Sequence, residues 1–410
     1  MIRVFEAFAG YGSQSIALRN LGIEHEVVAI SEIDKYAIQA YESIHGPTNN
    51  LGDICKIDPK DIPQHDLFTY SFPCQDLSVA GKQAGLGKGT RSGLLYECEK
   101  IIEHCRPKYL LLENVKNLVG KKFKADFDKW LEYLEGLGYT NYWQVLNAKN
   151  YGVPQNRERV FVISILGEHE PFEWPTPIPL DKCITDILED EVDEKYYLSE
   201  EIQKRFKITN QNKNIIGTTK PDFRTIGQRD LVYDKNGIMG ALVATDYKQP
   251  KQIAEINQLG MLDIKGNEQI RRVYGANGIS PTLNTMQGGN RQPKILEIDL
   301  PCICASRGRN PENPSDRTAG APTEQRLEFN TKGTSNTITT VQKDNYVMET
   351  TYRIRKLTPR ECFRLMGMRD GDIDKIQAAG ISNTQQYKIA GNSIVINVLE
   401  AIFKNLFMEG

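Results

Sequence analysis

The sequence predicts an α/β fold into which a smaller β-rich region is inserted, and three observations support this. The first 170 residues alternate short apolar runs with amphipathic stretches, the pattern of a parallel sheet flanked by helices. A proline-rich passage at 170–179 interrupts that alternation, and the chain beyond it is rich in Thr, Asn, Gly and Gln. Helical signals return after residue 356. We therefore expect the C-terminal segment to complete the first domain.

The periodicity assigns each element to a range. Strands are expected at 2–8, 26–31, 66–72, 109–113 and 159–166, and helices at 13–21, 33–44, 93–104 and 126–136. The run Thr358-Pro359-Arg360-Glu361 places an N-cap, a first-position proline and a third-position glutamate in order, which predicts a capping box. A final helix is expected from Ser393 to Phe407.

Length and composition favour a soluble protein of two domains. The chain has 410 residues, of which 25% are charged and 40% hydrophobic. No apolar run approaches the roughly 18 residues of a membrane helix, and the strand-like start leaves no room for a signal peptide. The eight cysteines form no CxxC pair, which indicates reduced thiols and a cytoplasmic protein. Cys302-Ile303-Cys304 is not followed by histidines, so we expect no metal.

Charge is distributed unevenly along the chain. The formal net charge is only −2, yet residues 203–356 contain 24 Lys and Arg against 15 Asp and Glu. The remainder contains 27 against 38. A basic segment within an acidic protein predicts a surface that faces a polyanion.

The basic region also contains a weak internal repeat. Segments 237–244, 278–285 and 333–340 share a Gly-x-x-x-small-aliphatic-x-small pattern, and each follows an arginine: Arg229, Arg272 and Arg326. Their spacing is too uneven for a solenoid. Similar β-turn-β units in a small β-rich domain explain the pattern equally well.

Three features near the N-terminus suit an adenosine. Phe8-Ala9-Gly10-Tyr11-Gly12 lies between a strand and a helix, as in dinucleotide-binding turns, although a tight packing turn accounts for it as well. Glu32 ends the next strand, where an acid can bind both ribose hydroxyls. Asp53 follows as a second acid, suited to accepting from an adenine amino group.

Cys74 is the candidate nucleophile. An apolar run ends at Pro73-Cys74-Gln75, and the glycine-rich loop that contains Gly81 to Gly93 follows. A lone cysteine is usually a buried apolar side chain, but a thiol at a strand end before a glycine-rich loop is typical of a nucleophile.

Two further groups accompany Cys74. Glu113 ends the strand at 109–113 and can protonate a ring nitrogen as a thiolate adds to the ring. Arg157 and Arg159, two residues apart on an extended segment, are expected to point the same way, toward a carbonyl oxygen and a phosphate. Such an arginine pair also occurs on ordinary edge strands.

These motifs occur in a recognisable order. They are Phe-x-Gly-x-Gly, Pro-Cys-Gln, Glu-Asn-Val, Gln-Asn-Arg-Glu-Arg, Arg355-Lys356-Leu357-Thr358-Pro359-Arg360-Glu361 and Ala390-Gly391-Asn392-Ser393. With them, the chain resembles a DNA (cytosine-5)-methyltransferase of the bacterial restriction–modification type over about 1–165 and 353–407. The resemblance implies a Rossmann-like, S-adenosylmethionine-dependent methyltransferase domain with a β-rich target-recognition domain inserted. The expected domains are 1–172 and 351–410 for catalysis and 173–350 for recognition.

The resemblance also implies residue roles. Cys74 would attack carbon 6 of a flipped cytosine, Glu113 would protonate ring nitrogen 3, and Arg159 would bind the oxygen at position 2, with Arg157 supporting the base or the nearby backbone. The residues implied to bind S-adenosylmethionine are Phe8, Gly10, Gly12, Glu32, Ile33, Asp53, Ile54, Leu94 and Asn392. Ile33 stands where the family often has an aromatic residue, and Asn156 where it often has a basic one.

DNA contacts are expected from two places. Gln75, Ser78 and Arg91 belong to a segment that resembles the family's mobile catalytic loop. Thr337-Ile338 stands where the family has a Thr-Leu pair, with Arg326 as a candidate guanine reader. Arg272 with Thr282-Leu283 is nearly as good a candidate.

The expected partner is double-stranded DNA. The enzyme is expected to act as a monomer, and no association with a membrane is expected. A cognate restriction endonuclease would act on the same site without stable binding. Two alternatives remain at this stage. A tRNA cytosine methyltransferase shares the catalytic motifs, but the long basic insert favours DNA. A catalytically inactive DNA-binding regulator is disfavoured because the catalytic residues are present.

Overall fold

The computed structural model describes residues 1–73, 94–182, 184–197 and 352–408, together with short segments between 206 and 347. Those segments are 206–208, 215–218, 231–234, 252–254, 258–262, 271–275, 279–283, 292–298, 303–309, 324–329 and 345–347. Among these residues, no helix combines the length and the apolar character needed to cross a membrane.

A six-stranded sheet in the order β2-β1-β3-β4-β7-β5 forms the centre of the first region. Its strands are β1 (Ile2–Ala7), β2 (His25–Ser31), β3 (Leu67–Tyr70), β4 (Tyr109–Val115), β5 (Tyr139–Asn147) and β7 (Glu158–Leu166). β2 lies on one side of β1 and β3 on the other, so the strand order reverses direction at β1. Such a reversal opens a crevice at the carboxyl ends of the strands, where α/β proteins bind ligands.

The sheet is mixed, whereas the sequence predicted a parallel one. Strands β1 to β4 are parallel, but β7 runs antiparallel to both β4 and β5. A three-ten turn at 148–151 and the short β6 (Gln155–Asn156) connect β5 to β7. That connection is too short for the crossover that a parallel pair requires, so the chain folds back on itself.

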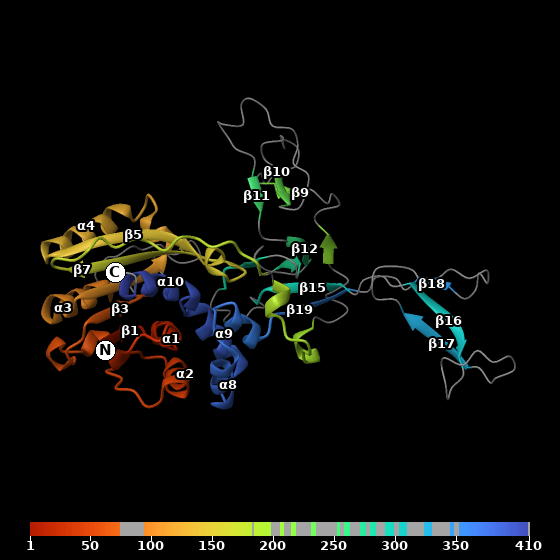
Figure 1. The fold of residues 1–410 in the computed structure, drawn as a ribbon, viewed down its shortest axis with the longest axis horizontal. Coiled ribbons are helices and arrows are strands. Elements are labelled where there is room, and N and C mark those ends of the chain that lie inside the picture. Colours follow the sequence, from red (N-terminus) through yellow and green to blue (C-terminus); the bar gives the residue numbers. More distant parts are fainter. Residues whose placement is uncertain are drawn as a thin grey trace, which may run out of the picture.

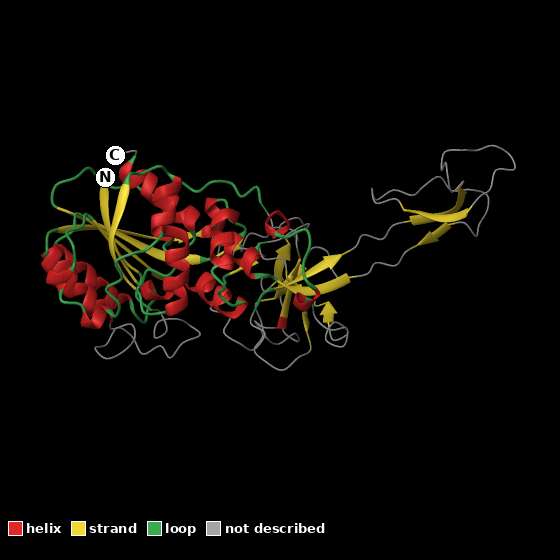
Figure 2. Cartoon of the chain, turned by 90° about the horizontal axis from the view of Figure 1, so that it is seen from below, coloured by secondary structure: helices red, strands yellow, loops and turns green. Residues whose placement is uncertain are grey.

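Helices cover both faces of the sheet (Figure 2). They are α1 (Ser13–Asn20), α2 (Lys35–His45), α3 (Leu95–Cys105), α4 (Lys124–Gly136) and α10 (Ile396–Phe407). Neighbouring strand residues enter different cores, as the pleat requires: Val4 packs in the core with α1 and α10, and Phe5 in the core with α3 and α4. The helices and strands expected from periodicity before residue 170 are confirmed to within a few residues.

The C-terminal helices return to the N-terminal half. Figure 1 shows α8 (Asp370–Ala378), α9 (Asn383–Asn392) and α10 in blue beside α1 and α2 in red. The capping box predicted for α7 (Pro359–Arg364) is confirmed, because Thr358 and Glu361 exchange side-chain to backbone hydrogen bonds. Buried Glu361 also accepts two hydrogen bonds from buried Arg355 at 2.8 and 2.9 Å, which joins α7 to the preceding strand.

The β-rich region forms several smaller sheets. Their orders are β19-β15-β13-β12-β8, β11-β10-β9 and β17-β16-β18, and β14 pairs with β6. The strands are β8 (Phe206–Ile208), β9 (Ile215–Thr218), β10 (Leu231–Asp234), β11 (Gln252–Ala254), β12 (Gln258–Leu262), β13 (Arg272–Gly275), β14 (Ser280–Pro281), β15 (Lys294–Ile298), β16 (Ile303–Arg309), β17 (Glu324–Phe329), β18 (Asn345–Val347) and β19 (Tyr352–Lys356).

Candidate active site

The turn between β1 and α1 has an unusual backbone. Phe8, Gly10 and Gly12 have φ values of 56°, 59° and 80°, a range that residues with a Cβ rarely adopt. A Cβ on Gly12 would lie 2.5 Å from His45 Nε2 and 2.6 Å from Tyr41, so Gly12 is required for packing. Among the described atoms, a Cβ on Gly10 would meet only Ser393 Oγ, at 3.7 Å. The strain at Phe8 marks a position that the surrounding structure imposes.

Glu32 fastens this turn to the end of β2. Its Oε2 accepts a hydrogen bond from the Gly10 N–H at 3.0 Å. Its Oε1 accepts from the N–H groups of Ile33 at 2.8 Å and Asp34 at 2.9 Å. Three backbone donors therefore fix the direction of a half-buried carboxylate beside the glycine turn.

The neighbouring predicted residues lie around Glu32. The Ile33 side chain is 73% exposed, which is unusual for a large apolar residue. Asp53 accepts from the Cys55 N–H at 3.1 Å and caps the turn 54–56, in which Ile54 is buried. Leu94 is half-buried just before α3, and Asn392 is exposed at the end of α9.

Asn50, which the sequence does not predict as a site residue, joins Glu32 to Gly52, the residue before Asp53. Its Nδ2 donates to the Glu32 carbonyl at 3.0 Å, and its Oδ1 accepts from the N–H groups of Glu32 and Gly52 at 3.1 and 3.0 Å. Asn50 therefore holds the segment that carries Asp53 against the end of β2. A single asparagine in a loop has no periodic signal by which the sequence would reveal it.

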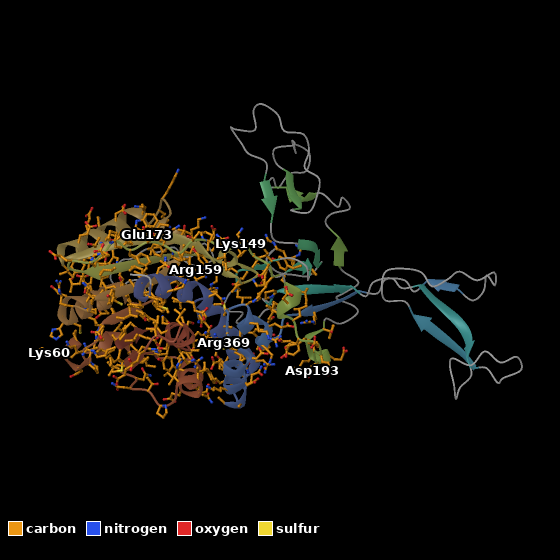
Figure 3. The ribbon with its side chains drawn as sticks, in the orientation of Figure 1. Lys60, Lys149, Arg159, Glu173, Asp193 and Arg369 are labelled. Carbon is orange, nitrogen blue, oxygen red and sulfur yellow. The ribbon has the colours of Figure 1, made fainter. Side chains whose placement is uncertain are left out.

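Glu113 and Arg159 form an ion pair at the end of β4. Arg159 Nε lies 3.1 Å from Glu113 Oε1, and both side chains are largely buried. Arg159 pairs with Val115 across the antiparallel strands, so it lies on the same face as Glu113, two residues away. Figure 3 shows the labelled Arg159 among the strands of the α/β region.

The pKa of Glu113 reflects two opposing effects. Burial raises the pKa of this carboxyl, while the positive charges of Arg159 and Arg157 and the hydrogen bond from Arg159 lower it. Burial prevails, and the pKa of Glu113 lies above its ordinary value. A carboxyl with a raised pKa is suited to donating a proton near neutral pH.

Arg157 has partners that the sequence did not predict. Its buried guanidinium donates to the carbonyls of Leu283 at 2.9 Å, Gly391 at 3.2 Å and Ser393 at 2.8 Å. That Arg157 and Arg159 point the same way stays a prediction, and the positive charge of Arg157 acts on Glu113 together with that of Arg159. Arg157 thus fastens the strand that precedes Arg159 to segments of the insert and of the C-terminus.

The chain just before Cys74 is anchored to the strand that carries Glu113. Buried Asn114 donates through Nδ2 to the Phe72 carbonyl at 3.1 Å. Phe72 and Pro73 are therefore attached beside the end of β4. Cys74 itself lies outside the described residues, as do Gln75, Ser78, Arg91 and Thr337.

The insert contacts β6 through residues 280–283, which belong to the second of the three similar segments, 278–285. Ser280 pairs with Gln155 and Pro281 with Asn156, and Thr282 Oγ1 donates to the Asn156 carbonyl at 2.7 Å. The Leu283 N–H donates to Gln155 Oε1 at 3.1 Å. Arg272 lies half-buried in β13, and Arg326 belongs to β17.

Comparison with known proteins identifies the family. Residues 2–408 match the family described as C-5 cytosine-specific DNA methylase. The chain belongs to this family. It is 35% identical to the type II methyltransferase M2.ScrFI of Lactococcus lactis subsp. cremoris, with 99% of each chain covered. It is 34% identical to the orphan methyltransferase M.SPBetaI of Bacillus phage SPbeta, over 99% of this chain and 97% of that one.

Solved structures agree on the fold of this methyltransferase. An Entamoeba histolytica methyltransferase, EhMeth, matches with a TM-score of 0.60 at 14% identity, covering 100% of this chain and 98% of that one. The S. pombe Dnmt2 methyltransferase matches with a TM-score of 0.56 at 16% identity, covering 100% and 99%. The expected Rossmann-like methyltransferase fold is confirmed, and the chain is a DNA cytosine-5 methyltransferase.

Proposed function

We propose that this methyltransferase transfers a methyl group from S-adenosylmethionine to carbon 5 of a flipped cytosine in double-stranded DNA, through a covalent bond to Cys74. The observation that carries this proposal is the buried Glu113–Arg159 pair, in which the acid has a raised pKa. Cytosine is stacked inside B-DNA, so its ring reaches such a pair only after extrusion from the helix.

The proposed steps assign a separate task to each side chain. The Cys74 thiolate adds to carbon 6 while Glu113 donates a proton to ring nitrogen 3, which leaves electron density on carbon 5. Arg159 binds the oxygen at position 2 and holds the ring in the plane of Glu113. Carbon 5 then gains the methyl group as the bond between that group and sulfur breaks, which leaves S-adenosylhomocysteine. Loss of the carbon 5 proton re-forms the double bond between carbons 5 and 6 and expels the Cys74 thiolate, and the proton on ring nitrogen 3 returns to Glu113.

The glycine-turn edge of the sheet fits S-adenosylmethionine, which supplies the electrophilic methyl group when bound. Glu32 is directed by three backbone donors and is suited to the ribose hydroxyls. The exposed Ile33 offers an apolar surface to adenine, and Asp53 an acceptor for its amino group. The remaining proposed contacts come from Phe8, Gly10, Gly12, Ile54, Leu94 and Asn392.

Arg157 takes a positioning role in this proposal. Its guanidinium joins Leu283 of the insert to Gly391 and Ser393 of the C-terminal segment, directly before the strand that bears Arg159. Removing it would separate three segments at once. We therefore assign Arg157 to holding Arg159 in place.

We further propose that residues 173–350 read the DNA, while 1–172 and 351–410 carry out catalysis. The excess of basic residues at 203–356 supports a phosphate-facing surface. The proposed contacts are Gln75, Ser78 and Arg91 from the catalytic loop and Arg272, Arg326 and Thr337 from the insert. Names of type II relatives favour a role in restriction–modification, with a cognate endonuclease acting on the same site, and phage relatives favour an orphan enzyme. In either case we propose a monomer that acts on DNA in the cytoplasm.

Parallel methylation assays test this function. Plasmid DNA and tRNA would be incubated with the enzyme and S-adenosylmethionine labelled in its methyl group. We expect label in DNA alone, at cytosines that bisulfite sequencing then locates, and none with Cys74→Ser. Label only in RNA would instead support the tRNA methyltransferase, and full activity of Cys74→Ser would exclude the covalent route.

A further inference from the structure

An ion pair links the start of α2 to α9, a helix near the C-terminus. Lys388 Nζ of α9 contacts Asp34 Oδ2 at the start of α2, across 354 residues of sequence. The two side chains are 26% and 23% exposed. Burial raises the pKa of Asp34, but the hydrogen bonds from Lys388 and the α2 backbone together outweigh it, and the pKa lies below its ordinary value. Asp34 is thus a carboxylate in the folded protein near neutral pH.

Asp34 makes further hydrogen bonds on the cofactor side. Its Oδ1 accepts from the N–H groups of Tyr36 at 2.9 Å and Ala37 at 3.4 Å, which caps α2. Its own N–H donates to Glu32 Oε1 at 2.9 Å. Lys388 contacts the carboxylate oxygen that the cap leaves available. A shift of Asp34 would therefore move one of the three donors that direct Glu32.

The C-terminal end of α9 lies beside the glycine turn. Asn392 lies four residues after Lys388, so both project from one face of the helix. Ser393, the next residue, comes within 3.7 Å of the Cβ position of Gly10. One helix thus contacts the Glu32 segment through Lys388 and lines the glycine turn with its last turn.

From this geometry we infer that Lys388 is a positioning residue for the S-adenosylmethionine site, which sets the spacing between Glu32 and Asn392 through Asp34. This inference rests on the proposed function, because it assumes that Glu32 and Asn392 contact the cofactor. Lys388 itself touches neither the cofactor nor DNA in this account. Its effect is on cofactor affinity.

A second ion pair between the same halves of the chain provides a matched control. Arg19 of α1 contacts Asp372 of α8 across 353 residues. This pair also joins an N-terminal helix to a C-terminal one, but neither partner contacts Glu32 or the glycine turn through a hydrogen bond among those described. A pair that only stabilises the fold would behave like this one.

The test is calorimetric titration of S-adenosylhomocysteine, the product without the methyl group, into the purified full chain without DNA. We compare the unaltered enzyme with Lys388→Met, Lys388→Arg, Asp34→Asn and Arg19→Met. Because a charge-assisted hydrogen bond is removed, we expect Lys388→Met to weaken binding about fivefold to tenfold. Asp34→Asn keeps a capping oxygen and should weaken binding by a similar factor.

The remaining variants separate positioning from stability. Lys388→Arg should retain affinity within about twofold, and Arg19→Met should lower the melting temperature without changing affinity. The double variant Lys388→Met, Asp34→Asn should bind no more weakly than either single variant. Equal affinity of Lys388→Met and the unaltered enzyme would overturn the inference, as would an equal loss in Arg19→Met. Failure of the unaltered enzyme to bind S-adenosylhomocysteine would instead overturn the proposed function.

Discussion

Two carboxylates at the carboxyl edge of one sheet have opposite surroundings. Glu32, after β2, accepts hydrogen bonds from three backbone N–H groups and remains half-exposed. Glu113, near the end of β4, is buried, contacts Arg159, and has a raised pKa. Hydrogen bonds from backbone donors favour the charged form of a carboxyl group, whereas burial favours the protonated form. The first environment suits binding and the second suits proton donation, so the proposed function gives the same residue type two different roles.

The largest effect should come from removing the acid. Glu113→Gln retains the size of the side chain but has no carboxyl proton to donate, so we expect kcat to fall by about 10²–10⁴. Affinity for S-adenosylhomocysteine should be unchanged, since Glu113 pairs with Arg159 and β3 separates its strand from β1. Single-turnover methylation and calorimetry on the same preparation check both values. A parallel loss of cofactor affinity would mean that the two regions are not separate.

Removing Arg159 should alter both the rate and its pH dependence. We expect Arg159→Met to lower kcat by about 10², because one polar contact to the cytosine is lost. Arg159 also lowers the pKa of Glu113, so that pKa should rise further in the variant. Since the protonated acid is the active form, activity is lost as pH rises through this pKa. The alkaline limb of the pH–rate profile should therefore move to higher pH, and a shift to lower pH would contradict this assignment.

Glu32 should give the converse pattern. Glu32→Gln keeps the shape of the side chain but loses its charge, and we expect affinity for S-adenosylhomocysteine to fall about tenfold. At saturating S-adenosylmethionine, kcat should stay within about twofold of the unaltered enzyme. Initial rates over a range of cofactor concentrations separate the two parameters. A lowered kcat with unchanged KM would assign Glu32 to the chemical step.

The smallest effect concerns the stability of the fold around the glycine turn. Gly12 and Gly22 both have positive φ, but a Cβ at Gly12 would overlap His45 and Tyr41, whereas none of the described atoms lies within 4 Å of a Cβ at Gly22. Gly22→Ala should cost about 1 kcal/mol of unfolding free energy from backbone strain alone. Gly12→Ala should cost about 1–3 kcal/mol more because of overpacking. Equal losses in chemical denaturation would show that packing at Gly12 is relaxed.

The sequence predicted the ends of the strands better than their pairing. The ends of β1, β2 and β4 follow from apolar runs that stop at glycine or at a carboxylate, and Glu32 and Glu113 were found this way. β5 was missed because it is an edge strand with exposed Trp143 and Gln144, which weakens its apolar pattern. Without β5, the antiparallel direction of β7 was not predictable.

Contacts between distant residues account for the other differences. Arg157 donates to the carbonyls of Leu283 and Ser393, which lie far from it in the sequence, so no local pattern around residue 157 predicts these contacts. The pairing of Lys388 with Asp34 spans almost the whole chain, and neither residue stands out locally. Such contacts depend on the packing of α9 against α2, which periodicity does not encode.

The most direct test of the account uses DNA in which cytosine is replaced by 5-fluorocytosine. Release of Cys74 requires loss of the carbon 5 proton, and fluorine cannot leave in that way, so the covalent complex should accumulate. With S-adenosylmethionine present, we predict an enzyme–DNA complex that survives denaturing electrophoresis, is absent with Cys74→Ser, and forms far more slowly with Glu113→Gln. A complex that still forms with Cys74→Ser, or no complex with an enzyme that methylates ordinary DNA, would contradict the account.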